Sequence, residues 1–171
     1  MKYRLSIFLA LLAGLVFAGQ AAAQGASFSN ADVEYTFELP DEKWKMTVKP
    51  SATTPNVEYV FGDRTDGHLE VRRLNLPPKA VLSDLLREEE QKLQFQPGYV
   101  AGKEEQFSGF LNGIAFNFEF VRAGRPMAGR FYFLRSGDSV YVLRFSGFRD
   151  KLRTIRNQTD SIARTFNIKK K

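Results

Sequence analysis

The residue types best suited to hold a metal ion lie together in the segment DRTDGHLEV. His68, the one histidine of the chain, closely follows Asp63 and Asp66. An imidazole and two carboxylates are ligands that zinc accepts, but zinc sites use three or four ligands and calcium sites need six to eight oxygens. The spacing also matches no calcium-binding loop. We therefore expect no metal here, and we interpret His68 as a turn residue that opens a strand.

Residues for catalysis are equally sparse. Nucleophilic catalysis needs an activated Ser, Cys or Thr beside a base. The chain has no cysteine, and it contains no G-x-S-x-G, S-x-x-K or H-E-x-x-H motif and no glycine-rich phosphate loop. The run Glu88-Glu89-Glu90 could supply an acid–base pair, but on the polar face of a helix it indicates a solvated surface. Acid pairs assembled by folding remain an alternative. The sequence predicts no catalytic residue, no cofactor and a non-enzymatic function.

Three arginines form the remaining candidate site. Arg122, Arg125 and Arg130 flank the turn-like segment RAGRPMAGR, and no acidic residue occurs between Val121 and Gly137. Guanidinium groups suit forked pairing with carboxylates or phosphates. One interpretation is a hairpin that contacts a partner. The alternative is a solubilising turn whose charges pair with the Glu88-Glu89-Glu90 run or with water.

The elements that would position these groups begin with two alternating segments. Residues 32–39 alternate polar and apolar, which predicts a half-buried strand. A proline and an aspartate then supply a turn. Trp44, the one tryptophan, opens a second strand in which Met46 and Val48 also point inward. We interpret Trp44 as structural, with a buried ring and an N–H that still reaches a partner.

The spacing of apolar residues also predicts the elements in the rest of the chain. It predicts, in order, strands over 56–63 and 67–77, a helix over 79–95, strands over 99–110, 114–121, 128–134 and 139–145, and a helix over 152–166. Phe116, Phe118 and Phe120 fall on one face of their strand, so we interpret them as structural.

The order of elements indicates an α+β fold. The strands over 128–134 and 139–145 are apolar at nearly every position, which is typical of central strands covered on both faces. We expect an α/β/α sandwich with a central, largely antiparallel twisted sheet and a helix on each face. The alternative is a cone like that of NTF2 or cystatin, in which one helix packs on one curved sheet. The second helix, at the C-terminus, argues against the cone.

The N-terminus carries the pattern of a secretory signal peptide. Lys2 and Arg4 precede an apolar run over residues 5–17, and Ala21-Ala22-Ala23 offers a cleavage site. A membrane-spanning helix needs roughly 20 apolar residues, more than this run provides. We expect residues 1–23 to be a signal peptide, 24–31 a flexible lead-in, 32–168 a single domain and 169–171 a basic tail. The mature protein would be soluble, in the periplasm or outside the cell.

Charge is distributed unevenly along the chain. Residues 24–113 hold 10 basic and 15 acidic side chains, whereas residues 114–171 hold 13 basic and 4 acidic ones. A basic surface often binds nucleic acid, but export makes that partner a poor fit. An anionic envelope component or an acidic protein fits better, and a solvated surface is the alternative.

Three segments together resemble the PsbP-like family. YTFELPDEKWKM resembles its opening strand, turn and tryptophan, SGFLNGIAFNFEF its mid-domain glycine-containing strand, and SIARTFNI its closing helix and short terminal strand. The resemblance spans residues 32–168. It implies an α/β/α sandwich, a fold similar to that of a Ran-binding nuclear import factor, and work through binding larger partners. No metal-retaining or Ran-contacting motif is matched, so no site residue is carried over.

Taken together, these observations predict an exported, non-catalytic binding or accessory protein that recognises a protein or an anionic envelope component. The alternative is a carrier whose sheet and helices enclose a small apolar ligand, since the 16 phenylalanines suit either a packed core or a pocket. Nothing in the sequence sets the oligomeric state.

Overall fold

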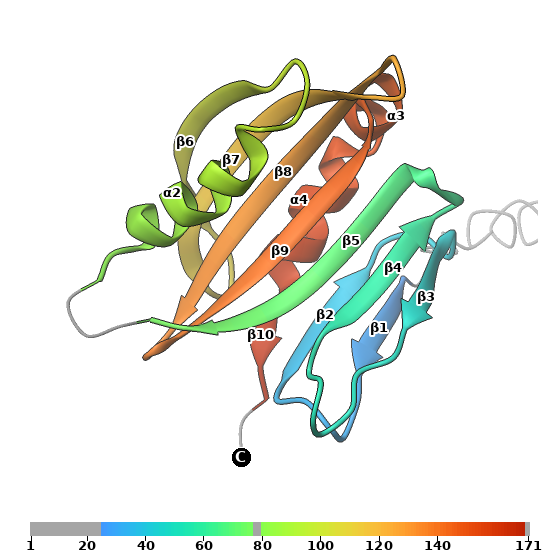
Figure 1. Ribbon diagram of the computed structural model, residues 1–171. Coiled ribbons are helices and arrows are strands. Elements are labelled where there is room, and N and C mark those ends of the chain that lie inside the picture. The colour runs from blue at the N-terminus through green and yellow to red at the C-terminus, as the bar shows by residue number, and fades with distance from the viewer. Residues whose placement is uncertain (1–24, 77–79, 170–171) are drawn as a thin grey trace, which may run out of the picture.

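The computed structural model of the protein describes residues 25–76 and 80–169 (Figure 1). The predicted signal peptide, residues 1–23, lies outside these ranges. So do residues 77–79, where the predicted strand over 67–77 ends and the predicted helix over 79–95 begins, and the last two residues of the predicted basic tail. Within the described ranges, no helix is long and apolar enough to cross a membrane.

A seven-stranded antiparallel sheet forms the centre of the molecule, in the order β3-β4-β5-β9-β8-β7-β6 (Figure 1). Its strands are β3 (Trp44–Val48), β4 (Val57–Phe61), β5 (Asp63–Asn75), β6 (Val100–Ser108), β7 (Asn112–Arg122), β8 (Arg125–Ser136) and β9 (Ser139–Phe148). As the sequence predicts, β8 and β9 are interior strands. Residues 131–134 of β8 are all buried, because their alternate side chains enter two different cores.

A second, three-stranded sheet packs against the first. It joins β1 (Ala26–Ser29) and β10 (Asn167–Ile168) to the two edges of β2 (Tyr35–Leu39). The sequence interpretation of residues 24–31 as a flexible lead-in is therefore wrong for β1. Phe28 is 3% exposed and its ring stacks 4.8 Å from that of Phe37, so this segment gains order from aromatic burial.

Helices cover both faces of the central sheet. α2 (Leu82–Leu93) packs on one face through Leu85, Leu86 and Leu93. α3 (Arg149–Thr154) and α4 (Arg156–Thr165) pack on the other face beside the small sheet (Figure 1). The sequence predicts one continuous C-terminal helix, but the backbone leaves helical geometry at Ile155. This break lets the Ile155 side chain pack where Gly67 of β5 leaves room.

Trp44 lies where the chain passes from the small sheet to the large one. The sequence predicts a turn between the strand at 32–39 and the strand that Trp44 opens, but these strands, β2 and β3, belong to different sheets. Trp44 is 4% exposed, and its indole Nε1 donates a 2.9 Å hydrogen bond to Gln158 of α4. Met46 and Val48, expected to point inward, are exposed because they lie beyond the aromatic core on the edge strand.

The phenylalanines of β7 build the core beneath α2. Phe116, Phe118 and Phe120 are all buried there, as their alternation predicts. Phe118 crosses directly over Gly129 of β8, where a Cβ atom would lie 2.0 Å from the ring. This close approach explains a glycine in the middle of a long interior strand.

The architecture is thus the predicted α+β sandwich. Its sheet is antiparallel and has helices on both faces, whereas the alternative cone would leave one face without a helix. Aromatic side chains fill both cores and contact one another closely.

Candidate functional site

Two of the three predicted site arginines meet at the tip of the β7–β8 hairpin. Arg122 and Arg125 face each other across the pair, joined by a turn of Ala123 and Gly124 with φ of 49° and 73°. The Arg125 guanidinium lies 3.6 Å from the centre of the Phe148 ring, a cation–π contact that holds it in place. Within the described residues, neither arginine has a carboxylate within 4.0 Å.

Arg130, the third predicted arginine, lies apart from this pair. It is five residues beyond Arg125 on β8, and side chains separated by an odd number along a strand point to opposite faces. Arg125 therefore lies on the α2 side and Arg130 on the α3–α4 side. Arg130 is only 7% exposed, so it belongs to an interior network and not to the hairpin surface.

Four polar side chains hold the Arg130 guanidinium. Its Nε donates a 2.7 Å hydrogen bond to the Tyr132 hydroxyl, and its Nη1 donates one of 2.7 Å to Asn117. Asp160 of α4 lies 3.3 Å from Nε, and Glu105 of β6 lies 3.5 Å from Nη1. Burial raises the pKa of Tyr132, so its hydroxyl stays protonated and donates to Asp160. These contacts fix the guanidinium plane.

Arg130 lies at one side of a pocket of about 310 Å³ between the sheet and the helices α3 and α4. Three more arginines line it: Arg149, Arg153 and Arg156. The remaining lining residues are Asn117, Phe118, Glu119, Ala128, Gly129, Leu152 and Thr159. The pocket is at the same end of the sheet as the hairpin tip, since Met127, just after that tip, pairs with Phe148, just before α3.

The charges around this pocket are incompletely balanced. Arg149 lies 3.4 Å from Glu119, and Arg153 lies 3.5 Å from Asp150, a pair in which both side chains are largely exposed. Arg156 has no carboxylate within 4.0 Å among the residues at 25–76 and 80–169. We call the set Arg122, Arg125, Arg149, Arg153 and Arg156 the arginine end.

Sequence reasoning missed the three helix arginines. Their separations of four and three residues are those of one helical face. That spacing is present in the segment RDKLRTIR, but the apolar residues of the same segment indicate only core packing.

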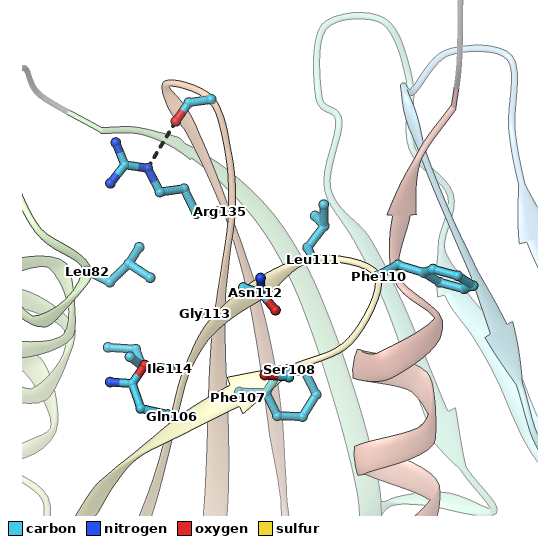
Figure 2. Close-up of a pocket in the computed structure, with 11 residues that line it drawn as sticks. Leu82, Gln106, Phe107, Ser108, Phe110, Leu111, Asn112, Gly113, Ile114 and Arg135 are labelled. Carbon is cyan, nitrogen blue, oxygen red and sulfur yellow. Dashed lines mark hydrogen bonds between the residues drawn. The ribbon is translucent and has the colours of Figure 1, made fainter.

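A larger hollow, of about 680 Å³, lies at the opposite end of β7 (Figure 2). The turns β6–β7 and β8–β9 and the start of α2 surround it. Arg135 is the one charged residue in its lining, and its Nε donates a 3.2 Å hydrogen bond to the Gly137 carbonyl. Phe110 points away from the hollow in Figure 2 and is 68% exposed. This open hollow offers little charge to select a ligand.

A third hollow, beside β10, has two carboxylates in its lining, Asp32 and Glu34. Glu34 accepts a 2.6 Å hydrogen bond from Tyr141 and lies 3.1 Å from Arg73, so the lining arginine is already paired. Burial would raise the pKa of Glu34, but the Tyr141 hydrogen bond and the nearby cations together lower it. The arginine end therefore remains the better candidate.

The side chains that the sequence offers as metal ligands make local contacts. His68 Nε2 lies 2.8 Å from Glu58, while Asp63 accepts hydrogen bonds from Thr65 that lower its pKa. No group of three or more metal-ligating side chains occurs within the described residues.

In the Glu88-Glu89-Glu90 run, Glu89 pairs with Arg72 and Lys92, and Glu90 accepts a hydrogen bond from Tyr99. Thus the hairpin arginines do not pair with this run.

The fold is shared with proteins of known structure. The Ran-binding protein Mog1p of Saccharomyces cerevisiae superposes with a TM-score of 0.61 at 11% identity, covering 84% of this chain and 95% of its own. The cyanobacterial PsbP (CyanoP) of Synechocystis gives 0.58 at 13% identity, covering 91% and 99%. LpqN of Mycobacterium tuberculosis, involved in cell envelope biogenesis, gives 0.53 at 16% identity, covering 85% and 86%.

These similarities confirm the fold resemblance predicted from the sequence. The chain has the fold of PsbP-like proteins and of Mog1p. Neither a protein-family model nor a curated protein sequence matches it. At such low identities the likeness concerns the fold alone, and function must be argued from the site.

Proposed function

We propose that this protein is an exported, non-catalytic binding protein that recognises an anionic partner, either a protein or an envelope component, through its arginine end. The observation that carries the proposal is the exposed pair Arg122 and Arg125, presented on a rigid hairpin and without carboxylates nearby. Arginine is the side chain best suited to bind carboxylate and phosphate groups in two-pronged geometry. Export rests on the signal-peptide pattern of residues 1–23.

The distribution of charge supports this surface. The β7–β8 tip, α3 and the start of α4 bring five exposed arginines to one end of the sheet, with Glu119 and Asp150 as the carboxylates they contact. Such a surface speeds encounters with anionic partners, and its attraction for them weakens as salt screens the charges. Two structural neighbours also support a binding role in their own settings: Mog1p binds Ran, and LpqN is involved in cell envelope biogenesis.

The alternative of a carrier for an apolar ligand has no observation in its favour. The two aromatic clusters pack ring against ring, and each of the three hollows described above is lined partly by polar or charged groups.

The test uses the exported protein and two kinds of bait. Cross-linking in the native envelope would capture a protein partner, and sedimentation with vesicles containing phosphatidylglycerol would measure binding to an anionic surface. The variant Arg122→Glu/Arg125→Glu should reduce one of these signals at least tenfold at low salt. Arg87→Glu, which changes an exposed arginine on α2, is the matched control. Equal binding by the tip variant and wild type in both assays, at low and high salt, would contradict the proposal.

A further inference from the structure

The pocket beside Arg130 has the construction of a ligand site that is separate from the hairpin tip. Its inner wall holds a guanidinium that is more than nine-tenths buried and already oriented by Asn117, Tyr132 and Asp160. The third nitrogen of this group, Nη2, makes no hydrogen bond with the described residues. An oriented donor with unused capacity can bind a ligand oxygen without first losing conformational freedom.

Charge in the pocket favours a ligand with more than one negative charge. Four arginines and one glutamate line it. Arg149 contacts that glutamate, Glu119, and Arg130 lies within 3.5 Å of both Asp160 and Glu105. This leaves Arg153 and Arg156 as the less compensated charges of the lining. Arg153 contacts only the largely exposed Asp150, a pairing that solvent weakens. Two guanidiniums without a strong carboxylate partner suit a compact dianion.

The walls of the pocket also leave room for an uncharged portion. Ala128 of β8 presents only a methyl group on this face, where a larger side chain would fill the space, and Leu152 of α3 adds an apolar wall. The volume of about 310 Å³ lies at the lower end of the range for small-molecule sites, roughly 300–1,000 Å³. A free inorganic anion would therefore leave much of the pocket unfilled.

We propose that this pocket binds a phosphate monoester carried on a small organic group. The phosphate, with a charge of about −1.5 to −2 at neutral pH, lies among Arg130, Arg153 and Arg156. The organic portion lies against Ala128 and Leu152. The phosphate monoester can belong to a soluble compound, such as a sugar phosphate, or to a lipid headgroup, as in phosphatidic acid. The site shares Arg153 and Arg156 with the arginine end, but it does not use Arg122 and Arg125, the pair that carries the proposed partner contact.

Calorimetric titration at fixed, near-physiological ionic strength tests the site with defined probes: glucose 6-phosphate, inorganic phosphate and glucose. Vesicles of phosphatidic acid, a monoester, are compared with vesicles of phosphatidylglycerol, a diester. We expect saturable binding of glucose 6-phosphate, at least tenfold tighter than inorganic phosphate, and none of glucose. Binding of phosphatidic acid vesicles without binding of glucose 6-phosphate would assign the same site to a lipid headgroup.

Three variants locate the binding. Arg156→Gln should weaken it at least tenfold, and Ala128→Leu should abolish it by filling the pocket without changing charge. Arg135→Gln, in the hollow of Figure 2, is the matched control and should bind like wild type. If Ala128→Leu fails to fold, the exposed Arg156→Gln, with Arg156→Lys as the charge-conserving partner, decides the result.

Several outcomes would overturn the proposed phosphate monoester site. No binding of glucose 6-phosphate together with equal binding of the two vesicle types would exclude a monoester site. So would wild-type affinity in folded Ala128→Leu or in Arg156→Gln. The tip variant Arg122→Glu/Arg125→Glu should keep its affinity for the monoester, which separates a failure here from a failure of the proposed partner contact.

Discussion

The indole nitrogen of Trp44, at the start of β3, donates a hydrogen bond of 2.9 Å to the side-chain oxygen of Gln158 in α4. This contact joins an edge strand of the central sheet to the C-terminal helix, two elements far apart in the sequence. It also gives the buried tryptophan the polar partner that its N–H group requires.

Removal of the Trp44 ring should destabilise the fold. Trp44→Ala should lower the free energy of unfolding by about 3–5 kcal/mol, the usual cost of deleting a buried aromatic side chain. Trp44→Phe should cost less, because an aromatic ring remains against Phe61 and Phe145 and only the N–H donor and part of the ring volume are lost. Urea unfolding followed by circular dichroism measures both changes. A wild-type unfolding midpoint for Trp44→Ala would show that the ring does not support the core.

The crossing of Phe118 over Gly129 predicts a strong coupling between the two positions. Gly129→Ala should cost about 1–3 kcal/mol, as overpacked core substitutions do, because the new Cβ would lie 2.0 Å from the Phe118 ring. In the background Phe118→Ala, the same substitution should cost much less. A double-mutant cycle of unfolding free energies measures the difference, and additive effects would contradict this packing.

Glu89 should contribute to the dependence of stability on pH. Burial would raise its pKa, but hydrogen bonds from Lys92 and Arg72 outweigh burial and lower it below the ordinary value of 4.5. A lowered pKa in the folded state stabilises the fold above pH 4.5, and this contribution is lost as the pH falls through the folded value. Unfolding free energies measured from pH 7 downward should decline less steeply in Glu89→Gln. Parallel profiles for the two proteins would refute this.

The Arg130 network should be strongly coupled as well. Arg130→Met should cost about 1–3 kcal/mol, because it leaves Asn117 without its donor and Asp160 without its cation in a partly buried site. Once Asp160→Asn has removed the carboxylate, the loss of Arg130 should cost less. Thermal and urea unfolding of the single and double variants measure the coupling, which should exceed about 0.5 kcal/mol for directly contacting residues.

The strands of the central sheet could be predicted because their signal is local. The alternation of Phe116, Phe118 and Phe120 and the continuous apolar run at 131–134 each follow from which faces of a strand are buried, and burial acts on every residue of the strand. The sheet to which a strand belongs could not be predicted in this way. The path from β2 to β3 changes sheets within a few residues, and no periodic pattern records the direction in which a chain leaves a turn.

The candidate site could be predicted only in part. The sequence identified Arg122 and Arg125, and strand parity alone would have placed Arg130 on the opposite face. The pocket itself depends on side-chain size at Ala128, on the break at Ile155 and on the packing of α3 over the sheet. These features arise from tertiary contacts between segments distant in the sequence, so a linear pattern cannot reveal them.

The pairing of β10 with β2 has a consequence for the order in which the molecule folds. Ile168 pairs with Tyr35, and the Lys169 amide donates to the Glu34 carbonyl, so the last strand of the domain closes against one of its first. During synthesis, β2 must wait for the rest of the domain, with Tyr35 and Phe37 still without the ring of Phe166. Folding can finish only after the C-terminal residues have left the ribosome. Contacts of such long sequence separation slow the final step.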